Sequence, residues 1–307
     1  MIIKTLKRIF RPIAVPPINW FYNLLGKYYP RKLISIKFRS IYHRDMDWEH
    51  PLTLDEKINW QKIYSDTSHW TKLADKYLVR QFVAQRGLED MLVKLYGRWE
   101  KAEQIDWQSL PQQFVMKANN GSGDILICSD KSKLNTDLET KKFKKVLHTR
   151  FGYKMAELHY NNIPPCIIAE ELLDVRKQPI NSSSLIDYKI WAFNGKPAYI
   201  WACYDRDVHS VQVGVYDLDW NFHPEYSVET DHYRIAKKQL PRPVALDKML
   251  EAASILSKGF PQVRVDLYEV DGKAYFGELT FTSNAGFNNF YTEEFLRELG
   301  SQVILNV

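Results

Sequence analysis

Charged side chains interrupt several strand-like apolar runs of this sequence, at positions where an apolar core would exclude them. They are Lys117, Lys189, Arg264, Asp266 and Glu278. Arg264 and Asp266 alternate with apolar residues, which places both on one face of their strand. Because a buried charge is costly unless it is paired, such a face requires compensating partners, water or a ligand. A polyphosphate that carries magnesium would supply this compensation.

The residue types suit that ligand. Lysine ammonium groups act as point charges on phosphate oxygens, and an arginine offers a fork for a phosphate in transfer. Mg²⁺ usually takes one or two carboxylates together with substrate phosphates, a role open to Asp266 and Glu278. The turn at 119–123, Asn-Asn-Gly-Ser-Gly, offers backbone N–H groups and room for a phosphate. Each feature alone also fits a solvated strand face or an ordinary hairpin tip, but their combination favours a phosphate site.

Other signatures of chemistry are missing from the sequence. It contains neither G-x-x-x-x-G-K-[ST] nor G-x-G-x-x-G, and neither H-E-x-x-H nor G-x-S-x-G. The three cysteines, Cys128, Cys166 and Cys203, are widely spaced, which argues against a disulfide framework and against a zinc site. We therefore expect a protein of the reducing cytoplasm.

The elements that must position these residues alternate between helices and hairpins. Apolar periodicity predicts helices over 54–63, over 73–82 with an end at Gly87, over 138–146 and over 246–256. Single strands are expected at 93–96, 166–173 and 211–216. Hairpins are expected at 114–118 with 125–128, at 186–193 with 197–204, and at 263–270 with 274–281, the last two through Asn-Gly and Asp-Gly turns. This pattern predicts an α+β fold with mostly antiparallel strands rather than a doubly wound parallel sheet.

The positive charge of the chain is concentrated at its N-terminus. The formal net charge of the 307 residues is +5, yet the first 44 hold ten Lys or Arg and no Asp or Glu. A short amphipathic segment, 2–11, precedes Pro12. It either lies on an anionic membrane surface or forms a solvated basic lead-in that packs on the body. No apolar run approaches the roughly 20 residues of a spanning helix, and no nucleic-acid module accompanies the charge.

Taken in order, the motifs resemble those of the ATP-grasp superfamily, and within it the TupA-like branch associated with teichuronopeptide biosynthesis. The resemblance runs from about Leu52 to Gly300 and rests on the segments 73–77, 79–80, 114–117, 121–123, 170–171, 187–189, 263–268 and 276–281. It implies two α+β subdomains that grip a nucleotide between antiparallel sheets. The expected divisions are a basic helical extension (1–50), a helical central region (51–110), a small subdomain with a flexible glycine loop (111–175) and a C-terminal subdomain with the Mg-ATP site (176–307).

The resemblance also implies a set of nucleotide contacts. They come from Lys76, Lys117, Gly121, Ser122, Gly123, Glu170, Glu171 and Lys189. The lysines would contact phosphates, the Gly-Ser-Gly turn would close over them as a flap, and the two glutamates would hold adenine and ribose.

Catalytic and metal roles follow from the same resemblance. Arg264 would steady developing negative charge, and Lys189 would contact the acyl phosphate. Asp266 and Glu278 would bind magnesium. Thr280 stands where superfamily members often have asparagine; its hydroxyl is a poorer ligand, so Asn284 or water would complete the metal shell.

The implied activity is that of an ATP-dependent and Mg²⁺-dependent carboxylate–amine ligase that forms an amide through an acyl phosphate. The branch suggests a uronic acid of a cell-surface polysaccharide as the carboxylate and an amino acid or peptide as the amine. No nucleic-acid partner is expected. One alternative is a kinase acting on a sugar hydroxyl, with its base among His159, His209, His223 and Asp205. The other is a non-catalytic nucleotide-binding protein.

Overall fold

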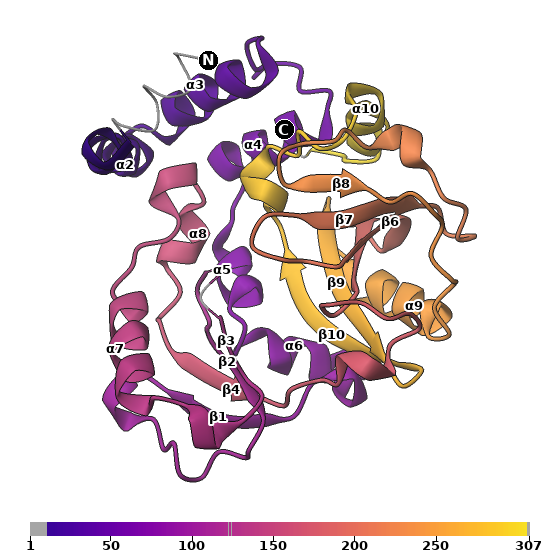
Figure 1. The fold of residues 1–307 in the computed structure, drawn as a ribbon. Coiled ribbons are helices and arrows are strands. Elements are labelled where there is room, and N and C mark those ends of the chain that lie inside the picture. Colours follow the sequence, from indigo (N-terminus) through magenta and orange to yellow (C-terminus); the bar gives the residue numbers. More distant parts are fainter. Residues whose placement is uncertain (1–10, 122, 124, 306–307) are drawn as a thin grey trace, which may run out of the picture.

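Two sheets, each accompanied by helices, make up the body of the protein (Figure 1). The computed structural model describes residues 11–121, 123 and 125–305. Within these residues the helices are α2 (Arg11–Tyr28), α3 (Pro30–Tyr42), α4 (Leu54–Tyr64), α5 (Ser68–Ala74), α6 (Val79–Gln85), α7 (Thr136–Leu147), α8 (Leu158–Asn161), α9 (Leu246–Ser257) and α10 (Glu293–Ser301). The chain therefore has the α+β fold that its sequence predicts.

Three antiparallel hairpins contribute most of the strands of the two sheets, as predicted. They pair β2 (Phe114–Ala118) with β3 (Ile125–Cys128), β5 (Asp187–Phe193) with β6 (Lys196–Tyr204), and β9 (Val263–Val270) with β10 (Lys273–Thr280). The turn residues Asn194 and Gly195 both have positive φ, and so do Asp271 and Gly272. Asn-Gly and Asp-Gly tolerate this conformation, which is why these two hairpins can be predicted from local sequence.

The remaining strands complete the two sheets. In the four-stranded sheet, β4 (Ile167–Glu170) lies between β2 and β1 (Leu95–Trp99), in the order β1-β4-β2-β3. The six-stranded sheet adds β7 (Val211–Tyr216) and β8 (Tyr233–Ile235), in the order β10-β9-β5-β6-β7-β8. The β7–β8 pair is parallel, unlike the other pairs. β1 belongs to the predicted central region (51–110), whereas β2, β3 and β4 belong to the predicted small subdomain (111–175). The smaller sheet therefore crosses one predicted boundary, and the four domain boundaries stay a prediction.

The helix predicted through 73–82 is wrong: the chain forms two helices, α5 and α6, with a break at 75–78. Asp75 has an extended backbone, and its carboxylate accepts hydrogen bonds from the backbone N–H groups of Tyr77 and Leu78. The N–H of Lys76 donates to the carbonyl of Asn119, 3.2 Å away. Apolar periodicity continues through this break, so the periodicity alone did not reveal it. The break attaches Lys76 to the turn that follows β2.

The six-stranded sheet is packed on both faces. One face packs Val265 and Leu267 against α9, α5 and α6. The other packs Trp191 and Trp201 against α4 and α10. Both tryptophans are buried and belong to the core of this face.

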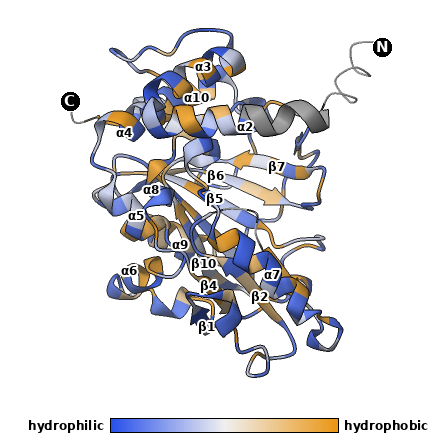
Figure 2. Cartoon of the chain, turned by 90° about the vertical axis from the view of Figure 1, so that its left-hand side faces the viewer, coloured by the Kyte–Doolittle hydropathy of each residue, from blue (hydrophilic) through white to orange (hydrophobic). Residues whose placement is uncertain are grey.

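Helices α2 and α3 belong to the N-terminal extension and lie at the same end of the molecule as α4 (Figure 2), where α3 contacts α4. Leu33, Ile34 and Phe38 of α3 are buried in a cluster with Phe287. This part of the extension therefore packs on the body. Residues 2–10 of the predicted amphipathic segment 2–11 lie outside the described residues. No helix in the described part of the chain has the length and apolar character to cross a membrane.

Candidate functional site

A β-bulge in the last hairpin brings two carboxylates together. Phe276 pairs with Leu267, but the next pair is Glu278 with Asp266, so Gly277 is an extra residue in β10. A Cβ on Gly277 would lie 2.9 Å from the carbonyl oxygen of Asp266, closer than real contacts allow. The bulge reverses the alternation of side chains along β10. As a result, Phe276 joins the core while Glu278 shares the opposite face with Asp266.

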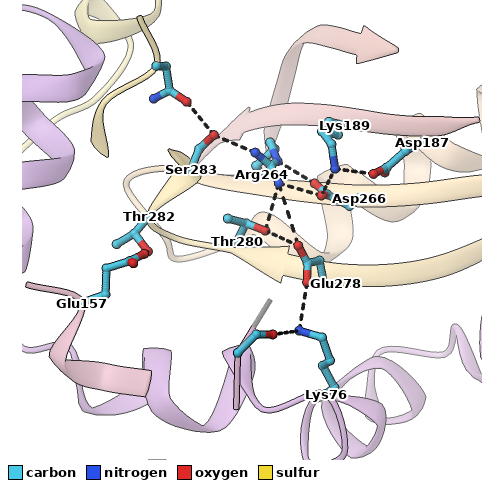
Figure 3. A network of polar contacts seen from close by, with 12 residues as sticks. Lys76, Glu157, Asp187, Lys189, Arg264, Asp266, Glu278, Thr280, Thr282 and Ser283 are labelled. Atoms are coloured by element: carbon cyan, nitrogen blue, oxygen red, sulfur yellow. Dashed lines mark hydrogen bonds and ion pairs between the residues drawn. The ribbon is translucent and has the colours of Figure 1, made fainter. Parts of the chain in front are cut away.

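Charged side chains from three adjacent strands meet on this face (Figure 3). Lys189 pairs with Asp266 in register, and its Nζ lies 2.6 Å from the Asp266 carboxylate. Arg264 binds the same carboxylate through two hydrogen bonds of 2.7 Å. Lys189 also forms an ion pair with Asp187. The Arg264 guanidinium lies 3.9 Å from Glu278. The predicted site residues Lys189, Arg264, Asp266 and Glu278 thus form one connected cluster.

Lys76 joins this cluster to the glycine turn of the other sheet. Its Nζ lies 3.3 Å from the Glu278 carboxylate and donates to the carbonyl of Gly121 at 2.9 Å (Figure 3). Since its own backbone N–H donates to Asn119, Lys76 holds the turn at two points. Ser122, also predicted to belong to the site, lies outside the described residues.

A second charged cluster lies on the four-stranded sheet. The Lys117 ammonium is 2.7 Å from the Glu170 carboxylate, and the Arg80 guanidinium is 2.9 Å from it. Arg80 also donates to the carbonyl of Val93. Glu171, the next residue, is exposed, and nothing in the described part of the chain joins its side chain to Lys117. The structure therefore separates the two predicted glutamates.

Thr280 lies beside Glu278. Its hydroxyl donates to the Glu278 carboxylate at 3.1 Å and accepts from Arg264 at 3.3 Å. The amide of Asn284, the expected substitute ligand, instead donates to the carbonyl of Phe287. Among the described contacts, Asn284 has none with Asp266 or Glu278.

The cluster controls the charge states of its members. Burial raises the pKa of Glu278, but Lys76, Lys189 and Arg264 lower it to about 2, so this carboxylate is ionised. Burial lowers the pKa of Lys189, yet the charges of Asp187 and Asp266 leave it above its usual value. Burial raises the pKa of Asp187. One oxygen of Asp187, Oδ1, is buried without a hydrogen-bond partner in the described structure.

This donor set fits a magnesium–triphosphate group. Asp266 and Glu278 share one face and supply hard carboxylate oxygens, of which Mg²⁺ needs only one or two when phosphates supply others. Lys76, Lys189 and Arg264 supply cations for phosphate oxygens. The unpartnered Oδ1 of Asp187 leaves a further acceptor beside the same cluster.

The candidate bases of a kinase lie apart from this cluster. His159 is buried against Trp70 and Tyr160, and burial lowers its pKa to about 3, so it is neutral. His209 and His223 lie outside the strands that carry the cluster. Asp205 accepts a hydrogen bond from Ser183. None of these four has a described contact with Arg264 or Glu278.

Sequence reasoning assigned no role to four residues of the site. Arg80 and Asp187 stand inside the quoted motifs, and Gly277 is a glycine within a strand, which often marks a bulge. The fourth, Ser283, accepts a 2.6 Å hydrogen bond from Arg264. Nothing in its local sequence distinguishes it from an ordinary loop serine.

Comparisons with known proteins give one family match and several distant structural matches. The family model described as TupA-like ATPgrasp matches residues 56–304. Among solved structures, D-alanine–D-alanine ligase from Bacillus anthracis is 16% identical over 76% of this chain and 67% of its own, with a TM-score of 0.43. The ATP-grasp ligase PsnB, complexed with precursor peptide PsnA2 and AMPPNP, is 12% identical over 92% of this chain and 73% of its own, with a TM-score of 0.38.

Phosphoribosylamine–glycine ligase from Thermotoga maritima is 12% identical over 70% of this chain and 49% of its own, with a TM-score of 0.41. The chain thus spans about two thirds of the length of the Bacillus anthracis ligase and about half of the Thermotoga maritima enzyme. No curated protein matches the chain.

Proposed function

Since the family model covers residues 56–304, the chain belongs to the TupA-like ATP-grasp family, and on this premise we propose that it is an ATP-dependent ligase that joins a carboxylate to an amine. The observation that carries the proposal is the connected cluster of Lys189, Arg264, Asp266 and Glu278 on one sheet face. A carboxylate oxygen would attack the γ-phosphorus of ATP, and ADP would leave. The amine nitrogen would then attack the acyl carbon, and phosphate would leave as the amide bond forms.

Asp266 and Glu278 would hold Mg²⁺, while Lys76 and Lys117 would bind the phosphates of ATP. ATP supplies the phosphoryl group, and the metal neutralises phosphate charge. Lys117 belongs to β2, and Lys76, in the break before α6, is tied to the turn that follows β2, so both lysines lie on the side of the smaller sheet. A triphosphate that contacted these lysines and a metal held by Asp266 and Glu278 would therefore contact both halves of the molecule.

Arg264 is well suited to stabilise developing negative charge. Its guanidinium is held by Asp266 on one side and by Ser283 on the other. Donors fixed before the reaction begins need no reorganisation as charge develops, which is the main source of electrostatic catalysis. Lys189 acts as a cation and not as a base, because its pKa is raised.

The glycine turn supports a further step, exclusion of water. Lys76 binds the carbonyl of Gly121, so a group bound at Lys76 would lie next to the turn. Closing this turn over the site would protect an acyl phosphate from hydrolysis.

The substrates that the family resemblance suggests are a uronic acid of a cell-surface polysaccharide and an amino acid or peptide. The enzyme would act in the cytoplasm, at the inner face of the membrane. The exposed aromatic residues of α2, Trp20 and Phe21, together with the basic N-terminal segment, support such a membrane contact. Replacement of Trp20 and Phe21 by serine, which leaves the buried residues of α3 in place, would weaken membrane partition if this placement is right and leave it unchanged if it is wrong.

The decisive test is an ADP-release screen of uronic acids crossed with amino acids, with mass detection of the conjugate. A ligase gives ADP, phosphate and an amide. A phosphorylated acceptor would identify a kinase instead. If no combination of substrates raises ADP release above the rate with ATP alone, the screen supports a binding protein.

A further inference from the structure

Arg264 is the end of a buried hydrogen-bonded chain that leads to the N-terminal extension. Its Nη1 donates to the Ser283 hydroxyl at 2.6 Å, and this hydroxyl donates to Oδ1 of Asn288 at 2.7 Å. The backbone N–H of Asn288 donates to the Asp55 carboxylate at 2.6 Å, and its side-chain amide donates to the same group. The Tyr42 hydroxyl, at the end of α3, donates to Asp55 as well.

The two ends of this chain fix its direction. An ionised Asp55 can only accept hydrogen bonds, so the NH₂ group of Asn288 must face it and Oδ1 must face Ser283. The Ser283 hydroxyl then donates to Oδ1 and keeps its lone pairs for Arg264, which can only donate. Asp55 and Asn288 have no exposed surface, and Ser283 has 1%. These members of the chain are therefore shielded from bulk water.

The loop that contains Ser283 and Asn288 is held in a strained conformation by α4. Asn284, Ala285 and Gly286 all have positive φ, which is unfavourable for the first two residues. The side chain of Asn59 donates to the carbonyl of Gly286 at 2.7 Å, and Lys62 donates to that of Ala285 at 3.0 Å. Such strain persists where surrounding contacts over-determine it. Here those contacts come from α4, the helix that contains Asp55.

We propose that Tyr42, Asp55 and Asn288 are positioning residues that set the orientation of the Arg264 guanidinium through Ser283. Tyr42 and Asp55 precede residue 56, where the family match begins. The hydrogen bonds that hold Asn288 therefore come from residues N-terminal to the matched region. The orientation itself follows from the contacts above. Its catalytic consequence rests on the proposed function, in which Arg264 stabilises transferred charge.

The test compares Tyr42→Phe and Ser283→Ala with Tyr199→Phe. The control removes a similar hydroxyl–carboxylate contact, between Tyr199 and Glu298, that does not lead to Arg264. The first readout needs no nucleotide: the side-chain ¹⁵Nε resonance of Arg264, identified by its loss in Arg264→Lys. We expect this resonance to shift or broaden in Tyr42→Phe and Ser283→Ala, to stay in place in Tyr199→Phe, and to recover in Ser283→Thr.

The second readout is ATP turnover. In Tyr42→Phe and Ser283→Ala we expect kcat to fall about tenfold, with little change in the KM for ATP. This is the effect of losing one hydrogen bond in a chain that ends on a charged group. The proposal is overturned if the Arg264 resonance in both variants matches that of Tyr199→Phe. If the resonance moves but the wild-type protein turns over no ATP with any acceptor pair, the ligase function fails while the positioning role stands.

Discussion

Lys76 and Glu278 lie 3.3 Å apart, ammonium to carboxylate, although 202 sequence positions separate them and they belong to opposite halves of the molecule. Lys76 follows α5 and is tied to the glycine turn of the smaller sheet, whereas Glu278 belongs to the last strand of the larger one. The contact exists because the chain breaks its helix at Asp75 and bulges its strand at Gly277. Both local irregularities therefore serve one junction, between the turn and the candidate metal ligand.

Replacement of Lys76 by alanine tests this junction. The variant loses a cation that faces both Glu278 and the glycine turn, so we expect the KM for ATP to rise about tenfold or more, the effect of losing one charged hydrogen bond. Lys72→Ala on the exposed side of α5 is the matched control and leaves the KM unchanged. An equal KM in both variants would remove Lys76 from the nucleotide site.

Gly277→Ala tests the bulge. The added Cβ would lie 2.9 Å from the Asp266 carbonyl, so the hairpin must shift and the two carboxylates must separate. We expect Mg²⁺-dependent ATP turnover to fall by about a hundredfold, a few kcal/mol of lost stabilisation. Gly272→Ala, in the turn of the same hairpin, costs stability through its positive φ but leaves the bulge intact. Equal activity of the two variants at equal folded fraction would contradict this role.

Lys189→Met tests the charge balance on the sheet face. Lys189 contacts both Asp187 and Asp266, and its removal leaves buried carboxylates with one partner fewer. Breaking a buried ion pair costs about 3–5 kcal/mol, so the free energy of unfolding in urea should fall by that order. Added Mg²⁺ should recover part of the lost unfolding free energy in this variant. The control, Lys196→Met at an exposed position, should lose no such stability. A variant as stable as the wild type, with or without Mg²⁺, would argue against the site.

Asp55→Asn tests the pH dependence of the buried chain. Burial raises the pKa of Asp55 from 3.8 to about 6, so the folded protein holds this proton more tightly than the unfolded one. Its contribution to stability is therefore largest at low pH and is lost as pH rises towards 6. Asparagine does not titrate. The stability of the wild type minus that of the variant should fall by on the order of 3 kcal/mol between pH of about 4 and 7. A difference that is constant with pH would contradict this assignment.

The parts of the fold that the sequence predicts are those set by neighbouring residues. The hairpins at Asn194-Gly195 and Asp271-Gly272 follow from turn chemistry, and the charged positions in β5, β9 and β10 mark the site face. The helix break at Asp75 depends on a distant partner, Asn119, and apolar periodicity continues through it. The bulge at Gly277 has a local signal, because the apolar positions of this segment shift there from Ala274 and Phe276 to Leu279 and Phe281.

The least predictable feature is the contact between Asp55 and Asn288, which spans 233 positions. An aspartate near the start of a helix normally interacts with that helix, and nothing local indicates a buried asparagine as its partner. Likewise, Glu170 and Glu171 are alike in sequence, but strand alternation directs only Glu170 towards Lys117.

Equilibrium binding of AMPPNP, with and without Mg²⁺, tests most directly whether the clustered charges hold a metal-bound triphosphate. Glu278→Gln keeps the shape of the side chain but removes its charge, and Glu251→Gln on the exposed side of α9 is the matched control. We predict saturable, Mg²⁺-dependent binding to the wild type and the control, and binding at least about tenfold weaker in Glu278→Gln, the scale of one lost charged contact. Binding that is independent of Mg²⁺, or equal in all three proteins, would contradict the account.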